Sequence, residues 1–332
     1  MNNSATSSQV QHEVEPIAEN ERVTVELSSE CRARLAEIHS TPAYGDVGND
    51  YDLDALREGM GARREPEIDE IIIERVEAGG VPAQWVYRPD CTGARRMMYL
   101  HGGGYVSGSG DSYLPLAAQL ARATGCAILL PDYRLAPEHP HPAAVQDAVA
   151  AFAWMRENGP NESGAASATF IGGDSAGGGL TMATLLFLRD AVPKQVLPNA
   201  AITISAYADL AHTGLSVQAR AAADPIMSPR CLPLFAAAYL GGIDPRTPTA
   251  SPLYADWRGL PPILMQAGDC EIIRDDTVRA AHRAREAGVD ARLEVWDQMF
   301  HVWHASTPIL DEARAAIARI AEFFEEVAPS SA

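Results

Sequence analysis

The stretch Gly173-Asp174-Ser175-Ala176-Gly177-Gly178 contains the pattern Gly-x-Ser-x-Gly, and this pattern decides the fold. An apolar, strand-like run at 168–171 precedes it, and a helical run at 178–189 follows it. A serine at such a strand-to-helix elbow sits in a strained turn, and glycines two positions before and after it let strand and helix approach each other. The pattern predicts that Ser175 projects its hydroxyl as a nucleophile, whereas the structural alternative is a turn in which the serine only caps the helix.

A second glycine run, His101-Gly102-Gly103-Gly104-Tyr105, follows a strand-like stretch at 97–100. Glycines let backbone N–H groups point inward without obstruction by side chains, and an elbow serine needs such a loop as one half of its oxyanion hole. The N–H of Ala176, at the start of a helix, would supply the other half. The two motifs together favour acyl transfer, and they make His101 an anchor of the loop and not a base.

Strands and helices alternate along most of the chain. Such an alternation is typical of the α/β class, with a mostly parallel sheet covered by helices on both faces. About eight strands are expected, at 71–76, 83–88, 97–100, 127–130, 168–171, 200–205, 263–266 and 291–296, and helices are expected at 28–40, 51–60, 114–123, 143–157, 178–189, 276–287 and 309–327.

Two parts of the chain lie outside this alternation. The first twenty residues are polar and acidic, which is typical of a disordered tail, and two helical candidates follow them. Further on, five prolines lie in and around a helical piece at 231–240. Both parts carry apolar faces, so we expect them to meet as a cap over Ser175. The expected division is a tail at 1–20, cap helices at 21–60, a catalytic domain at 61–210 and 251–332, and a cap insertion at 211–250.

A nucleophilic serine needs a base, and His301 is the best placed histidine. It lies on the loop after the last expected strand, 291–296. His304 follows about one helical turn later, which places it further from the end of the sheet. The other histidines lie in the tail, in helices or in loops, so the sequence favours His301.

The base in turn needs an acid that fixes its tautomer and stabilises the imidazolium. The candidates follow the expected strand 263–266. Asp275 and Asp276 stand where a helix starts, so we expect them to act as N-caps. Asp269 and Glu271 remain, and either could project from the loop.

With these motifs the chain resembles the hormone-sensitive lipase family of esterases, the bacterial group often called family IV. It shares Asp132-Tyr133-Arg134-Leu135-Ala136-Pro137-Glu138 between the two glycine motifs, and Ser251-Pro252-Leu253-Tyr254 and Gly259-Leu260-Pro261-Pro262 ahead of the acid. The resemblance runs from about Val81 to the C-terminus. It implies the α/β-hydrolase fold with a helical cap, the chain order serine, acid, histidine, and hydrolysis of carboxylic esters with short acyl chains.

The resemblance also implies roles for individual residues. The family's acid motif, Asp-Pro-Leu-x-Asp-Glu, takes the register of 271–276, which places the acid at Glu271 and leaves Asp269 as the alternative. The oxyanion hole would consist of the N–H groups of Gly103, Gly104 and Ala176. The expected triad is therefore Ser175, His301 and Glu271.

Two further expectations come from the same resemblance. It implies cis peptide bonds before Pro137 and Pro142, and it offers other functions. Members with a similar acid motif include lactone hydrolases, so a lactone or amide hydrolase on the same triad is the alternative activity. A non-catalytic ligand receptor is a further alternative, but such receptors typically lose the histidine, and His301 is present.

Composition excludes several classes of partner. The formal net charge of -18 argues against binding to nucleic acid or an anionic membrane. The five cysteines form no Cys-x-x-Cys pair, which favours a reducing compartment, and no signal peptide or membrane span is visible, so a cytoplasmic location is expected. We expect no metal or organic cofactor, because an activated serine and fixed dipoles suffice. The expected partner is a small ester, with a second copy of the chain as a further candidate.

Overall fold

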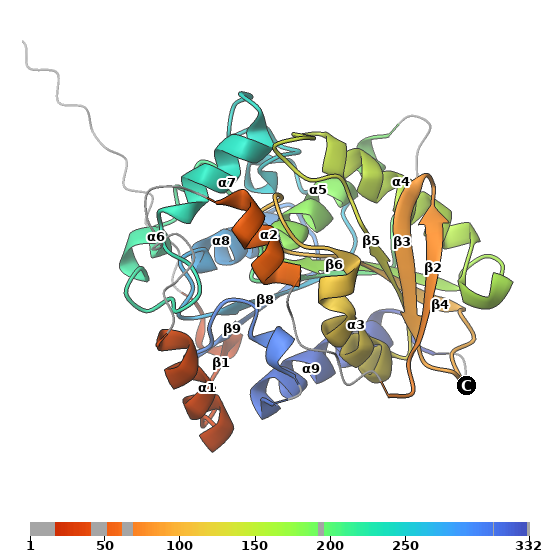
Figure 1. Cartoon of the computed structure of the whole chain (residues 1–332), viewed down its shortest axis with the longest axis horizontal. Coiled ribbons are helices and arrows are strands. Elements are labelled where there is room, and N and C mark those ends of the chain that lie inside the picture. Colours follow the sequence, from red (N-terminus) through yellow and green to blue (C-terminus); the bar gives the residue numbers. More distant parts are fainter. Residues whose placement is uncertain (1–16, 41–51, 62–68, 192–195, 308, 331–332) are drawn as a thin grey trace, which may run out of the picture.

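The central feature is a single sheet, to which nine strands of the described residues contribute (Figure 1). The computed structural model describes residues 17–40, 52–61, 69–191, 196–307 and 309–330. The strand order is β1-β9-β8-β7-β6-β4-β5-β3-β2, and neighbouring strands are parallel except in the pairs β2–β3 and β3–β5. The strands are β1 Arg22–Val23, β2 Ile72–Ala78, β3 Val81–Tyr87, β4 Arg95–Leu100, β5 Ala127–Pro131, β6 Ala168–Asp174, β7 Ala200–Ile204, β8 Ile263–Gly268 and β9 Ala291–Trp296.

Helices cover both faces of this sheet, as the alternation predicted. Successive residues of β6 illustrate the reason, because Phe170 packs with the helices of one face and Ile171 with those of the other. Phe170 stacks on Phe324 with their ring centroids 3.9 Å apart. One face carries α3 (Gly110–Thr124) and α9 (Asp311–Val327), and the other carries α4 (Ala143–Glu157), α5 (Ala176–Asp190) and α8 (Arg274–Glu286). The expected α/β class, with a mostly parallel sheet covered by helices on both faces, is confirmed.

The short edge strand β1 was not expected from the sequence. Arg22 pairs with Val295 and Val23 with Trp296, in parallel register. Just before β1, Glu21 forms an ion pair with Arg285, and Ile17 packs against the main core. The last residues of the expected tail at 1–20 are therefore structured, since Ile17 packs against the core and Glu19–Glu21 form a short 3-10 helix, while residues 1–16 lie outside the described residues.

The two N-terminal helices contact different parts of the fold. Helix α1 (Ser29–His39) begins at the N-cap Ser28, whose hydroxyl accepts the Cys31 N–H at 3.0 Å. Its apolar side packs with Phe300 and Trp303, on the loop that carries His301. Helix α2 (Leu53–Gly61) lies instead beside α3. The two helices, α1 and α2, therefore pack against different elements of the fold.

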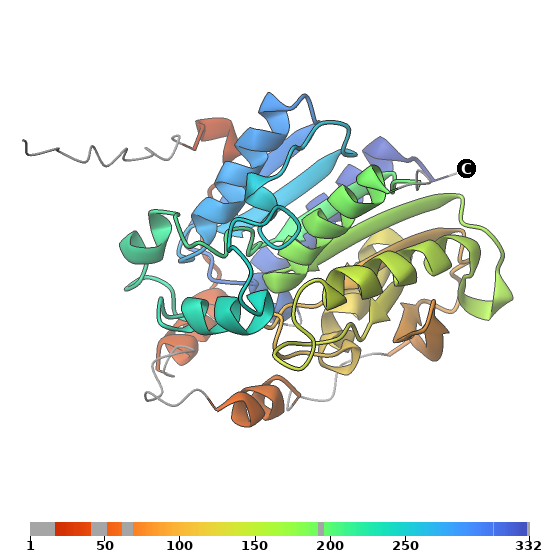
Figure 2. The same ribbon diagram turned by 90° about the horizontal axis from the view of Figure 1, so that it is seen from above.

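The insertion at 211–250 contains α6 (Ser216–Ala219) and α7 (Cys231–Leu240), and α7 has the bounds expected from the sequence. Figure 2 shows the insertion, in teal, at the same end of the sheet as α2, in orange. The N-cap roles expected for Asp275 and Asp276 were wrong, because α8 begins at Arg274 and both carboxylates reach out of the helix. Asp275 accepts the Ser216 N–H at 2.9 Å, and Asp276 accepts two backbone N–H groups after β7. These bonds tie the start of the insertion to α8.

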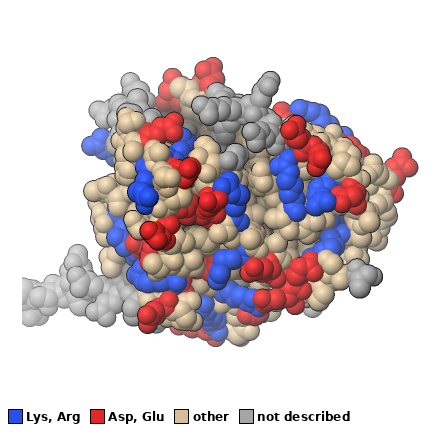
Figure 3. Space-filling model, turned by 90° about the horizontal axis from the view of Figure 1, so that it is seen from below, with Lys and Arg blue, Asp and Glu red and all other residues tan. Residues whose placement is uncertain are grey.

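Three smaller findings complete the fold. The peptide bonds before Pro137 and Pro142 are both cis, which confirms the expectation. Within the described residues, no helix combines the length and the apolar character that a membrane crossing requires. On the face drawn in Figure 3, basic and acidic side chains are interspersed, so the negative net charge is not gathered there into one acidic field.

Candidate active site

Ser175 lies at the turn between β6 and α5, with φ 51° and ψ -120°. Its N–H donates to the Ile204 carbonyl at 2.9 Å, and its carbonyl accepts from Tyr207 N at 2.8 Å, so backbone bonds on both sides hold the strained turn. A Cβ on Gly173 would lie 2.5 Å from the Leu100 carbonyl oxygen, which no side chain tolerates. The glycines of the motif therefore have the packing role that the sequence predicted.

The residue before the serine fastens the elbow to the glycine loop. Asp174 is buried, and its carboxylate accepts hydrogen bonds from the hydroxyls of Tyr99 at 2.9 Å and Tyr113 at 2.8 Å. The Tyr113 oxygen in turn accepts the Gly102 N–H at 3.0 Å. Sequence reasoning missed both tyrosines, because nothing in their spacing reveals contacts made across the sheet.

His301 and Glu271 are brought together at the loops after β9 and β8. Nδ1 of His301 lies 3.0 Å from Oε2 of Glu271, and both side chains are buried. Burial lowers the pKa of His301, but its hydrogen bond and Coulomb attraction to Glu271, helped by Asp224 and Asp174, outweigh this effect and raise the pKa above its ordinary value. The arrangement suits a base whose charged form is stabilised.

The rejected candidate His304 lies in a different environment. Its Nε2 contacts Oε1 of Gln266 at 2.8 Å in the core, and burial lowers its pKa to about 3. A ring that stays neutral and fully buried cannot exchange protons with a substrate at neutral pH.

The two candidate acids, Glu271 and Asp269, differ in burial and in hydrogen-bond partners. Glu271 is fully buried, whereas the carboxylate of Asp269 binds two arginines, Arg220 at 3.0 Å and Arg274 at 2.9 Å. The geometry thus turns Glu271 toward His301 and Asp269 toward the guanidinium groups.

Ser205, which the sequence analysis did not single out, joins the three loops. Its hydroxyl donates to Oε1 of Glu271 at 2.7 Å and accepts the Val302 N–H at 3.1 Å. It directly follows Ile204, whose carbonyl binds the Ser175 N–H. The Ser205 side chain therefore connects Glu271 with the loop of His301, and its backbone neighbour Ile204 holds the turn of Ser175.

The expected oxyanion donors lie on the glycine loop after β4 and at the first residue of α5. Among the described residues, the N–H groups of Gly103, Gly104 and Ala176 have no protein acceptor, which leaves all three available to a ligand. Gly103 and Gly104 have φ values of 114° and 64°, which glycine adopts most readily. His101 anchors this loop, since its ring stacks on Tyr133 at 4.2 Å between centroids and burial lowers its pKa to about 4.

Replacing Gly104 with alanine should lower kcat by roughly 10- to 100-fold, because the loop would shift a donor of the oxyanion hole. The new Cβ would stand 2.7–2.9 Å from ring atoms of Phe235. Gly125→Ala is the matched control, since Gly125 has a similar φ of 67° but open space around it. Steady-state kinetics of both variants test this. Equal losses in the two variants would contradict a specific role for Gly104.

Elements outside the sheet cover the glycine loop. On α7, Phe235 lies against Gly104, and the Tyr239 ring stacks on that of Tyr105 with centroids 3.7 Å apart. From α2, the Arg57 guanidinium donates to the carbonyl of Val106 at 2.8 Å and to both carboxylate oxygens of Glu138 at 2.8 Å. The insertion and α2 are therefore both fixed to the loop that contains Gly103 and Gly104, the expected oxyanion donors.

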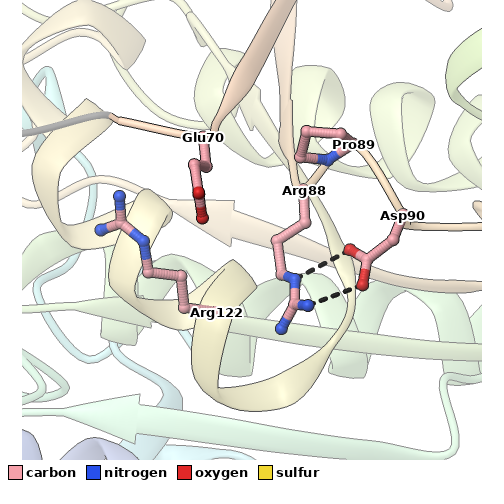
Figure 4. A pocket seen from close by; sticks show the side chains of 5 residues that line it. All are labelled: Glu70, Arg88, Pro89, Asp90 and Arg122. Atoms are coloured by element: carbon pink, nitrogen blue, oxygen red, sulfur yellow. Dashed lines mark hydrogen bonds and ion pairs between the residues drawn. The ribbon is translucent and has the colours of Figure 1, made fainter.

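A separate cavity of about 560 Å³ lies away from these residues. Its lining is charged, and Figure 4 shows the Arg88 guanidinium joined to the Asp90 carboxylate by two hydrogen bonds. The lining residues flank β2 and β3 or belong to α3, namely Glu70, Arg88, Pro89, Asp90 and Arg122. None of them carries a group of the candidate active site.

Comparisons with known proteins agree with this geometry. A family model described as alpha/beta hydrolase fold matches residues 97–305. An acetyl-hydrolase of Streptomyces hygroscopicus is 44% identical over 244 residues, which are 73% of this chain and 79% of the relative. The solved structure of EstE5 soaked with p-nitrophenyl butyrate is 40% identical, covers 90% of this chain and 99% of its own, and has a TM-score of 0.83.

A second solved structure adds a closer description. An esterase described as a member of the bacterial hormone-sensitive lipase family is 40% identical, with a TM-score of 0.80, and covers 91% of this chain and 99% of its own. The family match spans more than half of the chain, and it contains the serine elbow and the histidine loop. The chain therefore belongs to the α/β-hydrolase-fold family, and within it to the ester hydrolases of the bacterial hormone-sensitive lipase group.

Proposed function

We propose that the protein is a serine carboxylic ester hydrolase that acts on short-chain acyl esters through an acyl-enzyme, with Ser175 as nucleophile, His301 as general base and acid, and Glu271 as the orienting acid. The observation that carries the proposal is the distance of 3.0 Å between Nδ1 of His301 and Oε2 of Glu271. Ser175 adds to it, because it stands in the strained turn of a nucleophile elbow. This order of partners activates a hydroxyl that is otherwise a weak nucleophile.

In the first half of the reaction, Nε2 of His301 takes the proton of Ser175 as Oγ attacks the ester carbonyl carbon. The carbonyl oxygen becomes an oxyanion, and the N–H groups of Gly103, Gly104 and Ala176 are available to bind it. Glu271 stabilises the imidazolium. The imidazolium then gives its proton to the alkoxide that leaves, and the acyl group stays on Ser175.

In the second half, water replaces the alcohol. His301 takes a proton from the water, the hydroxide attacks the acyl carbon, and the same three N–H groups bind the new oxyanion. Collapse of this intermediate releases the carboxylic acid and returns the proton to Oγ of Ser175. No step needs a metal or an organic cofactor.

The preference for short acyl chains is proposed from the cap. Phe235 of α7 lies against Gly104, and Arg57 of α2 binds the carbonyl of Val106 on the same loop. We propose that the insertion and the N-terminal helices limit the acyl chain from this side. The same triad would open a lactone, in which the leaving alcohol stays tethered to the acyl group, so lactones belong in the substrate panel.

The activity should fall as the pH decreases through the pKa of His301. Glu271 opposes the effect of burial and raises that pKa, and only the neutral imidazole can accept the serine proton. The acidic limb of kcat/KM should therefore have its midpoint above the ordinary histidine value of 6.5. Initial rates from pH 5 to 9 measure it. A midpoint clearly below that value would argue against the His301–Glu271 pair.

The function itself is tested by substrate profiling together with active-site trapping. We expect hydrolysis of p-nitrophenyl acetate and butyrate, declining toward the dodecanoate, in comparison with a panel of lactones. An organophosphate should inhibit the enzyme and add its mass to the peptide that contains Ser175. Ligand binding without any turnover would support the receptor alternative, and a label on another residue would refute Ser175 as nucleophile.

A further inference from the structure

Asp224 is a buried carboxylate of the insertion that the mechanism above does not use. It lies between α6 and α7 and is 5% exposed. Within the described residues, no arginine, lysine or histidine forms an ion pair with it at contact distance. Burying a carboxylate without such an ion pair costs desolvation free energy, so other interactions must compensate for it.

Its hydrogen bonds are divided between the insertion and the acid loop. Oδ1 accepts the N–H groups of Ile226 at 2.9 Å and Met227 at 3.0 Å, which is a local turn. Oδ2 accepts the N–H of Ile272 at 2.9 Å, on the residue that follows Glu271. A purely local turn would not need the second oxygen to reach a segment so distant in the sequence.

The same segment also contacts the loop of the base. Ile226, two residues after Asp224, packs against the cluster that contains Phe300 and Trp303. These residues flank His301 on both sides. The segment around Asp224 therefore binds the turn that carries Glu271 and packs against the apolar cluster that includes neighbours of His301.

The titratable groups around His301 come from three parts of the chain. Glu271 and Cys270 belong to the loop after β8, Asp174 ends β6, and Asp224 comes from the insertion. Burial raises the pKa of the Asp224 carboxyl, while His301 and the three backbone N–H groups oppose that rise. The thiol of Cys270 has its pKa raised to about 11, chiefly by burial, so it adds no charge at neutral pH.

We propose that Asp224 is a positioning residue of this active site, which holds the turn that carries Glu271 against the insertion and adds a second negative charge facing His301. The inference rests on the proposed function. Under this proposal, the insertion helps to set the basicity of His301, in addition to its role as a cap.

The test compares three variants of the full chain. In Asp224→Asn, the charge is lost and the amide NH₂ cannot accept the Ile272 N–H. We expect the acidic limb of kcat/KM to move to lower pH by roughly half a unit, since a nearby negative charge that favours the imidazolium is gone. We expect kcat to fall about tenfold from the displaced acid, with little change in KM. Asp224→Glu, which keeps the charge, should retain the wild-type limb.

Asp209→Asn is the matched control. Asp209 is also buried, lies just before the insertion and accepts hydrogen bonds from Thr213 and Tyr254, and it pairs with Arg279. This variant should lose thermal stability, but the acidic limb of its kcat/KM should stay at the wild-type pH. The proposal would be overturned if Asp224→Asn, folded to the same extent as the wild type, had the same acidic limb of kcat/KM. Failure of Asp224→Asn and Asp224→Ser to fold would also overturn it, because Asp224 would then be purely structural.

A second readout separates this inference from the proposed function. Proton NMR titration of the His301 imidazole, assigned by the signal lost in His301→Ala, gives its pKa without any substrate. A lower His301 pKa in Asp224→Asn supports the inference even if the wild type hydrolyses no ester. An unchanged pKa overturns it even if ester hydrolysis is established.

Discussion

Replacing Ser175 with alanine should lower kcat for p-nitrophenyl butyrate by about 10⁶-fold, because the only proposed covalent partner of the acyl group is removed. The elbow itself should persist, since its hydrogen bonds to Ile204 and Tyr207 involve the backbone of residue 175. Initial rates at high enzyme concentration, corrected for spontaneous hydrolysis, measure the loss.

Ser167→Ala is the control for this experiment. Ser167 is exposed and lies directly before β6, at the opposite end of the strand from Ser175. It should keep wild-type kinetics, and both variants should have circular dichroism spectra and thermal midpoints close to those of the wild type. If Ser175→Ala kept more than a small fraction of the activity, water and not Ser175 would be the attacking group.

Changing Glu271 to glutamine should reduce kcat by about 10⁴-fold, the scale expected when a triad histidine is held in the wrong tautomer. A glutamine amide can donate to Nδ1 of His301, which would leave the proton on Nε2 and prevent it from accepting the serine proton. The fold should survive, because glutamine keeps an oxygen that can accept from Ser205 and Gly268.

Asp269→Asn, measured side by side, should cost far less. Its carboxylate binds Arg220 and Arg274, so its loss weakens ion pairs that solvent partly screens. Thermal midpoints of both variants show whether a loss of rate comes from unfolding. If Asp269→Asn abolished turnover and Glu271→Gln kept it near normal, Asp269 would be the acid of the triad.

Much of the fold could be predicted because most buried strands are apolar runs and several helices, such as α3, α8 and α9, have a clear amphipathic period. The elbow glycines on either side of Ser175 and the glycine run at 102–104 also act locally, so their spacing was informative. The strand β1 could not be found in this way, since two residues carry no periodic pattern and pair only through the backbone of β9.

The site was less predictable wherever a contact crosses the fold. The sequence left Asp269 and Glu271 open, since both stand on one short loop and only their partners distinguish them. Ser205 and Asp224 gave no signal because their partners are 66 and 48 residues away. The expectation for Asp275 and Asp276 failed for a related reason, since an acidic residue at a helix start can equally bind a neighbouring segment.

The small edge strand β1 has a practical consequence for any shortened version of the protein. It pairs with β9, whose Val295 and Trp296 are buried. Expression clones that start after Val23 would leave this side of β9 without its backbone partner, and an open, apolar strand edge invites sheet extension between molecules and aggregation. A truncation designed to open the cap would then cause insolubility, so shortened chains should begin at or before Ile17, whose side chain packs against the core.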